Sequence, residues 1–301
     1  MTYASLGELI RKASEQKSKI SRIVLADQSA QMEISEKVLY EKMSARLDVM
    51  RESDSRGRRN RKLSLSGLSG QAAGCLERYG KSHRSLLGKP AVEAMVTALA
   101  VTEQNAAMGR ICAAPTAGSC GILPAVLLTA MDEWKLEKKD VVMSLFTAAG
   151  VGMVLSNRAS LAGASGGCQA ECGSASAMAA AALTELEGGT PEMAGHACAL
   201  AIEGLLGLVC DPVAGLVEIP CVKRNAFAAV HAIAAAEMAL AGIPSRIPVD
   251  EVIDAMKQVG ELMPASLKET SKAGLAATDT AKRFEKKWKE SMAGVPQSEV
   301  K

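Results

Sequence analysis

The chain has 301 residues, enough to bury a large core, and this length allows one to three domains. The formal net charge is +2 and only 3% of the residues are aromatic. This argues against nucleic-acid binding, because both a basic surface and stacking side chains are scarce. In contrast, 48% of the residues are hydrophobic, mostly Ala, Leu, Val, Ile and Met. Small side chains let helices pack closely, so we expect an all-α fold, a compact helical domain rich in Ala and Gly.

Neither a signal peptide nor a membrane span is expected. Glu8 and Arg11 interrupt the N-terminal stretch MTYASLGELIRKASEQ. Residues 111–131 are uncharged and long enough to cross a bilayer, but Pro115 and Pro124 favour a loop followed by a buried helix. We expect a soluble, cytoplasmic protein. Its eight cysteines would then be buried, reactive or metal-bound rather than paired in disulfides.

The first 62 residues are predicted to form a charged, helical N-terminal segment, because residues 34–50 carry apolar side chains at helical spacing. The run 51–62 holds six basic residues and is predicted to be a solvated connector, with a docking surface for another chain as the alternative. The stretch LSLSGLSGQAAG, residues 63–74, is a small-residue loop and a plausible domain boundary.

Further helices are predicted along the rest of the chain, at 90–112, 121–134, 141–155, 170–186, 191–206, 225–241 and 249–262. Thr190 before Pro191 is a typical N-cap followed by proline at the first helical position. The predicted organisation is therefore an N-terminal segment, 1–62, a main helical domain, 63–285, and a polar tail, 286–301.

Three loops concentrate Gly, Ser, Thr and Cys, at 113–124, 163–176 and 209–225. Glycine lets backbone N–H groups approach a ligand closely, and a loop that opens a helix presents unpaired N–H donors to an anion. In PTAGSCG, the residues that could form such a cradle are Thr116, Ala117, Gly118, Ser119 and Gly121. Spacing alone leaves a simple packing loop as an equal alternative.

The cysteines fall into two groups. Cys168 and Cys172 form a CxxxC pair, and Cys210 and Cys221 lie at either end of a proline-punctuated loop. The others lie in apolar or helical stretches and are predicted to be inert core residues: Cys75, Cys112, Cys120 and Cys198. No Cys or His pair has the close spacing of a zinc site. Soft thiolates suit an iron–sulfur cluster better, although spacing alone does not require one.

Three stretches resemble the alpha chain of bacterial iron–sulfur L-serine dehydratase: MGRICAAPTAGSCGILPAVL (108–127), GASGGCQAECG (163–173) and CDPVAGLVEIPCVKRNAFAA (210–229). The resemblance covers roughly residues 63–281 and includes KETSKAGLAATDTAKRF near the end. One departure is Gln71 in LSGQAAG, where the family carries an acidic residue after paired glycines.

The resemblance implies that residues 63–285 are a catalytic domain in which Cys168, Cys210 and Cys221 hold a [4Fe–4S] cluster. Cys172 is not selected as a ligand. The implied reaction converts L-serine to pyruvate and ammonia. Three thiolates leave one iron open, and such an iron can act as a Lewis acid on the serine hydroxyl. The loop 116–121 would then bind the substrate carboxylate.

The general base of this reaction is not evident. His83 is predicted to lie at the surface, and His196 and His231 to be satisfied core histidines. The resemblance therefore implies a separate beta chain that completes the active site in a heterodimer or larger assembly. The run 223–225, Lys-Arg-Asn, either orients the carboxylate, tunes the cluster or simply begins a helix, and the role of Asn105 is open.

Other functions compete with this interpretation. The same domain could act on L-cysteine or L-threonine, because one methyl group changes binding by only about 1–3 kcal/mol. A pyridoxal-phosphate dehydratase would need a lysine for a Schiff base, for which Lys223 is the only tempting position, and a fold with alternating strands. A non-enzymatic helical scaffold explains the alanine content but not three cysteine-bearing loops.

Overall fold

A computed structural model describes residues 3–293, and within this range the chain forms thirteen α-helices and no named strand. The predicted all-α fold is confirmed. The helices are α1 (Leu6–Glu15), α2 (Ile20–Met32), α3 (Glu36–Arg59), α4 (Ala72–Ser82), α5 (Gly88–Ala106), α6 (Ile122–Glu133), α7 (Lys138–Arg158), α8 (Gly163–Gly166), α9 (Ser174–Leu186), α10 (Pro191–Glu203), α11 (Cys221–Leu240), α12 (Val249–Leu262) and α13 (Asp279–Ala293).

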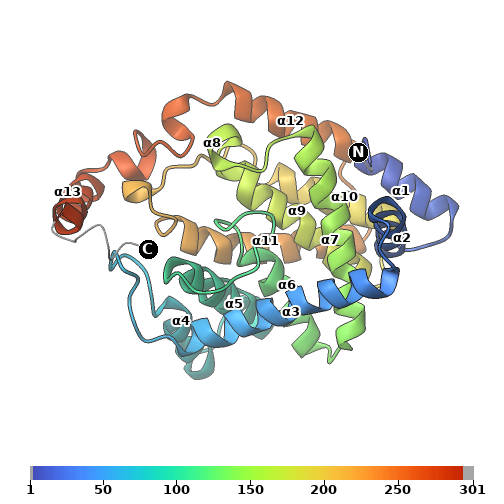
Figure 1. Cartoon of the computed structure of the whole chain (residues 1–301), viewed down its shortest axis with the longest axis horizontal. Helices are drawn as coiled ribbons and strands as arrows, with labels where there is room; N and C mark the ends of the chain where they lie inside the picture. Colours follow the sequence, from blue (N-terminus) through green and yellow to red (C-terminus); the bar gives the residue numbers. More distant parts are fainter. Residues whose placement is uncertain (1–2, 294–301) are drawn as a thin grey trace.

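Helix α9 lies at the centre of the molecule and is buried on nearly every side (Figure 1). Its sequence, SASAMAAAALTEL, consists mostly of small residues, and a helix without a polar face must be covered all round. It packs against α6, α7, α10 and α11. A five-residue π-helix, Gln169–Gly173, leads into it and carries one of the cysteine-bearing loops.

The predicted helices match the observed ones best where capping signals are present. Thr190 accepts a hydrogen bond from the Met193 amide at the start of α10, and α12 spans the predicted 249–262. The helix predicted over 90–112 ends at Ala106 instead, because Met108 adopts a positive φ of 59° and the Gly109 amide bonds back to Gln104.

The basic run 51–62 is not a connector over most of its length, so that part of the prediction was wrong, although most of its basic side chains are exposed as expected. Most of it forms the last turns of α3, where the half-buried Arg58 pairs with Asp54 at 2.7 Å and with Glu93 of α5 at 2.6 Å. Its guanidinium also donates to Thr97 Oγ1 at 2.7 Å. Arg58 therefore fastens α3 to α5, whereas the basic side chains at 56, 59, 61 and 62 are exposed.

One hydrophobic core includes residues from both the predicted N-terminal segment and the main domain. Leu9, Val24 and Leu47 belong to the same cluster of buried side chains as α7 and α9. The division at residue 62 stays a prediction. The predicted tail begins inside α13, and residues 294–301 lie outside the described residues.

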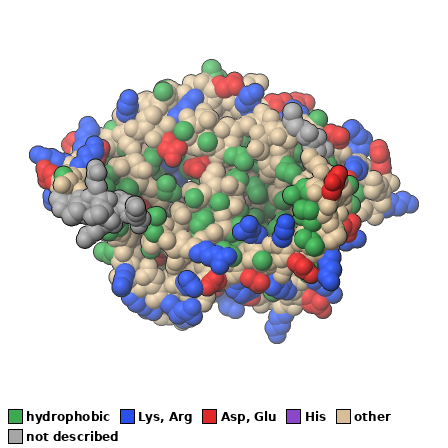
Figure 2. Space-filling view, in the orientation of Figure 1, with side chains coloured by type: hydrophobic (Ala, Val, Ile, Leu, Met, Phe, Trp, Pro, Cys, Tyr) green, Lys and Arg blue, Asp and Glu red, His purple; other side chains and the backbone are tan. Residues whose placement is uncertain are grey.

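The stretch 111–131 is a loop followed by the buried helix α6, as predicted. Among the described residues, α7 is the one helix long and apolar enough to span a membrane, and 61% of its apolar window is buried inside the molecule. Figure 2 shows apolar side chains gathered in the hollowed centre of one face, above α3, whereas charged side chains lie mostly along α3 and the outer edges.

Candidate metal centre

The three cysteines predicted to be ligands lie in one buried site. Cys168 and Cys210 are each 3% exposed and Cys221 is 8% exposed, and they come from three separate segments. They are close enough for a thiolate charge on Cys168 to act on both of the others. All eight cysteines are free thiols, so no disulfide competes for these sulfur atoms.

Gln169 holds the Cys168 segment in place. Its backbone amide donates to Leu208 O at 2.9 Å, two residues before Cys210. Its side chain is fully buried, donates to Met256 O of α12 at 2.9 Å and accepts from the Gly207 amide at 2.9 Å. A buried amide with both ends paired fixes its backbone, so the Cys168 and Cys210 segments keep a constant relation to each other.

Cys210 is fastened to a segment far along the chain. It forms an isolated parallel bridge with Lys268, in which its amide donates to Leu267 O at 2.9 Å and its carbonyl accepts from the Glu269 amide at 2.7 Å. The neighbouring Asp211 is buried, accepts from the Leu275 amide at 2.7 Å and pairs with Arg224 at 2.9 Å. The segment 267–275, most of which lies in the stretch KETSKAGLA, therefore acts as a strap over the Cys210 loop.

Cys221 opens helix α11, four residues earlier than the sequence pattern indicated. One turn later, the fully buried Asn225 turns its side chain toward the loop that precedes α6. Its amide nitrogen donates to Cys221 O at 3.0 Å and to Gly118 O at 2.7 Å, and its oxygen accepts from the Gly121 amide at 3.0 Å. Asn225 therefore joins the third cysteine to the predicted anion cradle.

The cradle loop, residues 116–121, contains three amides without an acceptor, one at the exposed Ala117 and two at the buried Gly118 and Ser119. The amides of Ala117, Gly118 and Ser119 have no hydrogen-bond acceptor within residues 3–293. The Gly121 amide, in contrast, donates to the Asn225 side chain. Asn105 donates to Ala117 O at 3.3 Å and so supports the loop from α5. The loop thus combines a fixed shape with successive free N–H groups, the arrangement that suits an anion.

Sequence reasoning missed Glu171, which joins the cradle to the thiols. Its Oε1 accepts from Thr116 Oγ1 at 2.8 Å, and a Cβ built on Gly118 would lie 3.0 Å from the same oxygen. A Cβ built on Gly163 would lie 3.1 Å from Glu171 Oε2 and 2.9 Å from Cys210 Sγ. The carboxylate therefore lies between the two parts of the site. The acidic residue inside GGCQAECG was the available signal.

Burial and mutual charge set the protonation of the site. Burial raises the pKa of Glu171, and the charge of Glu269 acts in the same direction. The hydrogen bond with Cys172, whose Sγ lies 3.4 Å away, lowers the pKa of Cys168, and the nearby Arg224 also lowers it. Burial raises the pKa of Cys221 to about 12. Binding a metal group here therefore requires protons to leave buried thiols.

The donor set fits an iron–sulfur group. Three buried thiols from rigid segments are soft ligands of the kind that such clusters use. No group of three or more His, Cys, Asp or Glu within residues 3–293 is arranged to hold a single metal ion. In an iron–sulfur cluster each thiolate binds a different iron, so the sulfurs need not converge on one point.

A family model described as serine dehydratase alpha chain matches residues 15–276. The chain belongs to this family. It is 48% identical over 288 residues to the probable L-serine dehydratase alpha chain of Bacillus subtilis, covering 95% of each chain. It is 42% identical to the L-serine dehydratase alpha chain of Peptoniphilus asaccharolyticus, covering 92% of this chain and 95% of the relative.

Other relatives of this serine dehydratase alpha chain are longer. The L-serine dehydratase of Streptomyces coelicolor is 41% identical over 277 residues, which cover 89% of this chain but 59% of the relative. The L-serine dehydratase 1 of Escherichia coli is 49% identical over 181 residues, 60% of this chain and 40% of the relative. These proteins carry additional sequence beside the part that matches.

Most other candidate residues of this family member lie outside the site. His83 is exposed, as predicted, and stacks on Tyr79, whereas His231 Nε2 donates to Ala201 O at 2.9 Å and is satisfied. Cys120 and Cys198 are buried, but Cys75 is exposed on α4, so its predicted place in the core was wrong. Lys223 is also exposed, which leaves Arg224 as the basic side chain of this run that contacts the site.

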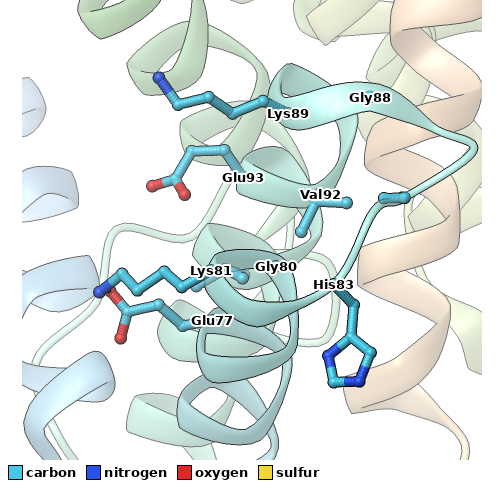
Figure 3. Close-up of a pocket in the computed structure, with 10 residues that line it drawn as sticks. Glu77, Gly80, Lys81, His83, Gly88, Lys89, Val92 and Glu93 are labelled. Carbon is cyan, nitrogen blue, oxygen red and sulfur yellow. The ribbon is translucent and has the colours of Figure 1, made fainter.

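A cavity of about 430 Å³ lies between α4 and the start of α5, away from the thiols. In Figure 3 the charged ends of Lys81, Lys89, Glu77 and Glu93 extend to the same side, and His83 points away from them. Lys81 is paired with Glu77 at 3.1 Å. The cavity shares no residue with the thiol site. We therefore do not assign the candidate active site to this cavity.

Proposed function

We propose that the chain is the catalytic subunit of an L-serine ammonia-lyase, which converts L-serine to pyruvate and ammonia with the help of a [4Fe–4S] cluster. One observation supports this proposal most directly. Glu171 contacts the amide-rich loop 116–121 and lies near the buried Cys210, in a chain of the serine dehydratase alpha chain family. The names of the aligned relatives support L-serine as the substrate.

In this proposal Cys168, Cys210 and Cys221 hold the cluster. A cluster bound by three thiolates offers one iron without a protein sulfur, an open Lewis-acid position for the substrate hydroxyl. The chain contributes rigidity: Gln169 fixes the first thiol, the strap 267–275 fixes the second, and the first turn of α11 carries the third. Rigid ligands matter because the three sulfurs must match one fixed inorganic framework.

The cradle loop binds the substrate carboxylate. The free amides of Ala117, Gly118 and Ser119 supply donors, and the Thr116 and Ser119 hydroxyls, 3.0 Å apart, add polar groups at the same loop. Asn105 and Asn225 hold the loop in one conformation by donating to the carbonyl oxygens of Ala117 and Gly118. A carboxylate held at this loop places the amino acid against Glu171, so orientation is part of the catalysis.

Glu171 takes the Cα proton of serine. Its carboxylate lies between the cradle and Cys210, where the Cα–H of a substrate bound at both ends would lie. A carboxylate whose pKa is raised by burial is a stronger base than an exposed one. Loss of the Cα proton and of the hydroxyl leaves aminoacrylate, which tautomerises and takes up water to give pyruvate and ammonia without a further protein group.

A beta chain completes the active enzyme. Relatives named alpha chain match this chain over 95% of their length, and this name itself implies a further chain, whereas the longer L-serine dehydratases carry additional sequence outside the part that matches. We propose that a separate polypeptide supplies the equivalent part beside the cradle. We also propose a cytoplasmic location, because thiols stay reduced there and remain able to bind a metal group.

The test is anaerobic purification of the full chain with and without a beta chain, followed by iron and sulfide analysis and pyruvate release from L-serine. We expect about four irons per chain, brown colour, and turnover only with the partner. L-Threonine and L-cysteine in the same assay measure the breadth of the substrate range. A yellow, iron-free protein that releases pyruvate would instead indicate pyridoxal phosphate and would refute the proposal.

A further inference from the structure

A second buried carboxylate lies inside the loop bounded by Cys210 and Cys221. Glu218 is 6% exposed, and the donors that the described residues supply to its side chain are all hydroxyls. Ser66 Oγ donates to Oε1 at 2.7 Å, and Ser64 and Ser69 both donate to Oε2. Three hydroxyl groups on one buried carboxylate form a short, charge-assisted network.

The three hydroxyls, called here the serine clamp (Ser64, Ser66 and Ser69), come from the loop expected to be a domain boundary. This loop closes on itself: the Ser64 amide donates to Ser69 O at 2.8 Å. Gly70 has a φ of +126°, and a Cβ built on it would lie 2.6 Å from Lys62 O. The loop therefore has a preset shape that turns three hydroxyls toward one point, which is more than a linker requires.

The backbone of Glu218 leads directly to the third cysteine. Its carbonyl accepts from the Val222 amide at 3.0 Å, in the first turn of α11, and its amide donates to Leu216 O at 2.7 Å. The next residue, Ile219, accepts from the Val213 amide at 2.9 Å across the loop. Fixing the Glu218 side chain therefore fixes the path of the chain three residues before Cys221.

We propose that Glu218 is a positioning residue that sets the placement of Cys221 relative to Cys210, and that the serine clamp holds it for this purpose. The inference rests on the proposed function, because positioning matters only if these thiols bind a cluster together. The carboxylate itself touches neither substrate nor metal. Its effect is on how well the chain assembles and retains the cluster, since ligands that cannot meet one rigid framework bind it loosely.

The experiment compares variants of the full chain, purified anaerobically with its partner if one copurifies. Glu218→Ala removes the acceptor, and Glu218→Gln keeps one acceptor oxygen and adds a donor that hydroxyls can accept. Glu185→Gln is the matched control, because Glu185 is equally buried and accepts from the Ser21 amide, at the end of α9 opposite the thiols. Iron and sulfide per chain, the visible absorbance spectrum and its half-life in air are measured, with far-ultraviolet circular dichroism for folding.

Glu218→Ala is expected to lower iron per chain at least threefold and to shorten the half-life of the absorbance in air at least fivefold, with unchanged helix content. Glu218→Gln is expected to recover part of both values, and Glu185→Gln to match the unaltered chain. If Glu218→Ala does not fold, Ser66→Ala removes one hydroxyl and is expected to shorten the half-life about twofold.

Unaltered iron content and half-life in a folded Glu218→Ala variant, or in Ser66→Ala where the former does not fold, would overturn the positioning role while leaving the proposed function intact. An unaltered chain that itself holds no iron would overturn the proposed function, and the inference with it. The two failures are distinguishable because the first appears only in the variant and the second appears in the starting protein.

Discussion

Asn225 and Gly121 are joined by a hydrogen bond of 3.0 Å between the Asn225 oxygen and the Gly121 amide, deep inside the protein. The same side chain donates to Cys221 O and Gly118 O. One buried amide therefore connects the third proposed metal ligand to the proposed carboxylate cradle. This side chain therefore fixes the position of the cradle loop relative to the first turn of α11.

Asn225→Ala is expected to weaken substrate binding more than metal binding. It leaves Gly121 N–H and Gly118 O buried without their partner, at a cost of about 1–3 kcal/mol each. The cradle then loosens, and KM for L-serine should rise about tenfold or more while iron per chain falls less than twofold. Steady-state pyruvate release and iron analysis on one preparation check this, and an unchanged KM would contradict it.

Glu171→Gln is expected to lower kcat by about 10² to 10⁴, the usual contribution of a positioned general base. The amide still accepts from Thr116 and fills the same volume, so KM and iron content should stay within about twofold. Single-turnover measurement with L-serine deuterated at Cα should show a larger isotope effect in the variant. A kcat near that of the unaltered enzyme would contradict Glu171 as the general base and would indicate that the partner chain supplies the base.

The sequence allowed the helical fold to be predicted, and the family resemblance gave a cysteine set that stays a prediction, but neither gave the contacts that connect the helices to these cysteines. Alanine-rich runs and the Thr190–Pro191 cap depend on local preferences, which a single sequence carries. The role of Asn225 depends on a contact across 104 residues with Gly121, and no local pattern encodes such a partner. Glu171 was overlooked for the same reason, because its place in the site depends on a hydrogen bond from Thr116, 55 residues away.

Charge patterns were the least informative signal. The basic run 51–62 and the Lys-Arg-Asn run 223–225 look alike in composition, yet Arg58 and Arg224 are paired within the protein, and Lys223 is exposed. Whether a basic side chain faces solvent depends on which carboxylate the fold brings to it. For Arg224 that carboxylate is Asp211, next to a proposed ligand, and only the fold reveals the pairing.

Removing each proposed ligand tests the assignment of the metal site. Cys168→Ala, Cys210→Ala and Cys221→Ala are each expected to abolish activity and to lower iron per chain at least fivefold, because two thiolates cannot hold a cluster meant for three. Cys75→Ala, at an exposed position on α4, is the control and should leave both values unchanged. Full iron content in all three ligand variants, measured by anaerobic colorimetric analysis, would refute the assignment.

Two adjacent basic residues give a matched pair for the Asp211 contact. Arg224→Gln leaves the buried Asp211 carboxylate without its cation, which costs about 3–5 kcal/mol for a buried pair, whereas Lys223→Gln changes an exposed side chain. We expect Arg224→Gln to lower both iron per chain and the unfolding midpoint, and Lys223→Gln to change neither. Equal behaviour of the two variants would mean that the Asp211–Arg224 pair does not hold the Cys210 loop.

Gly57→Ala tests the close crossing of α3 and α5 by thermal denaturation. A Cβ at this position would lie 2.0 Å from the Ala100 carbonyl oxygen, a backbone atom that moves only if the two helices separate. We expect a loss of about 1–3 kcal/mol, as overpacking usually causes, and a fall in Tm of several degrees. Gly80→Ala is the control, because its Cβ would meet only a Val92 methyl group at 3.0 Å and alanine favours the helix. A Gly57→Ala variant as stable as the Gly80→Ala variant would show that the helices cross with more space than the structure allows.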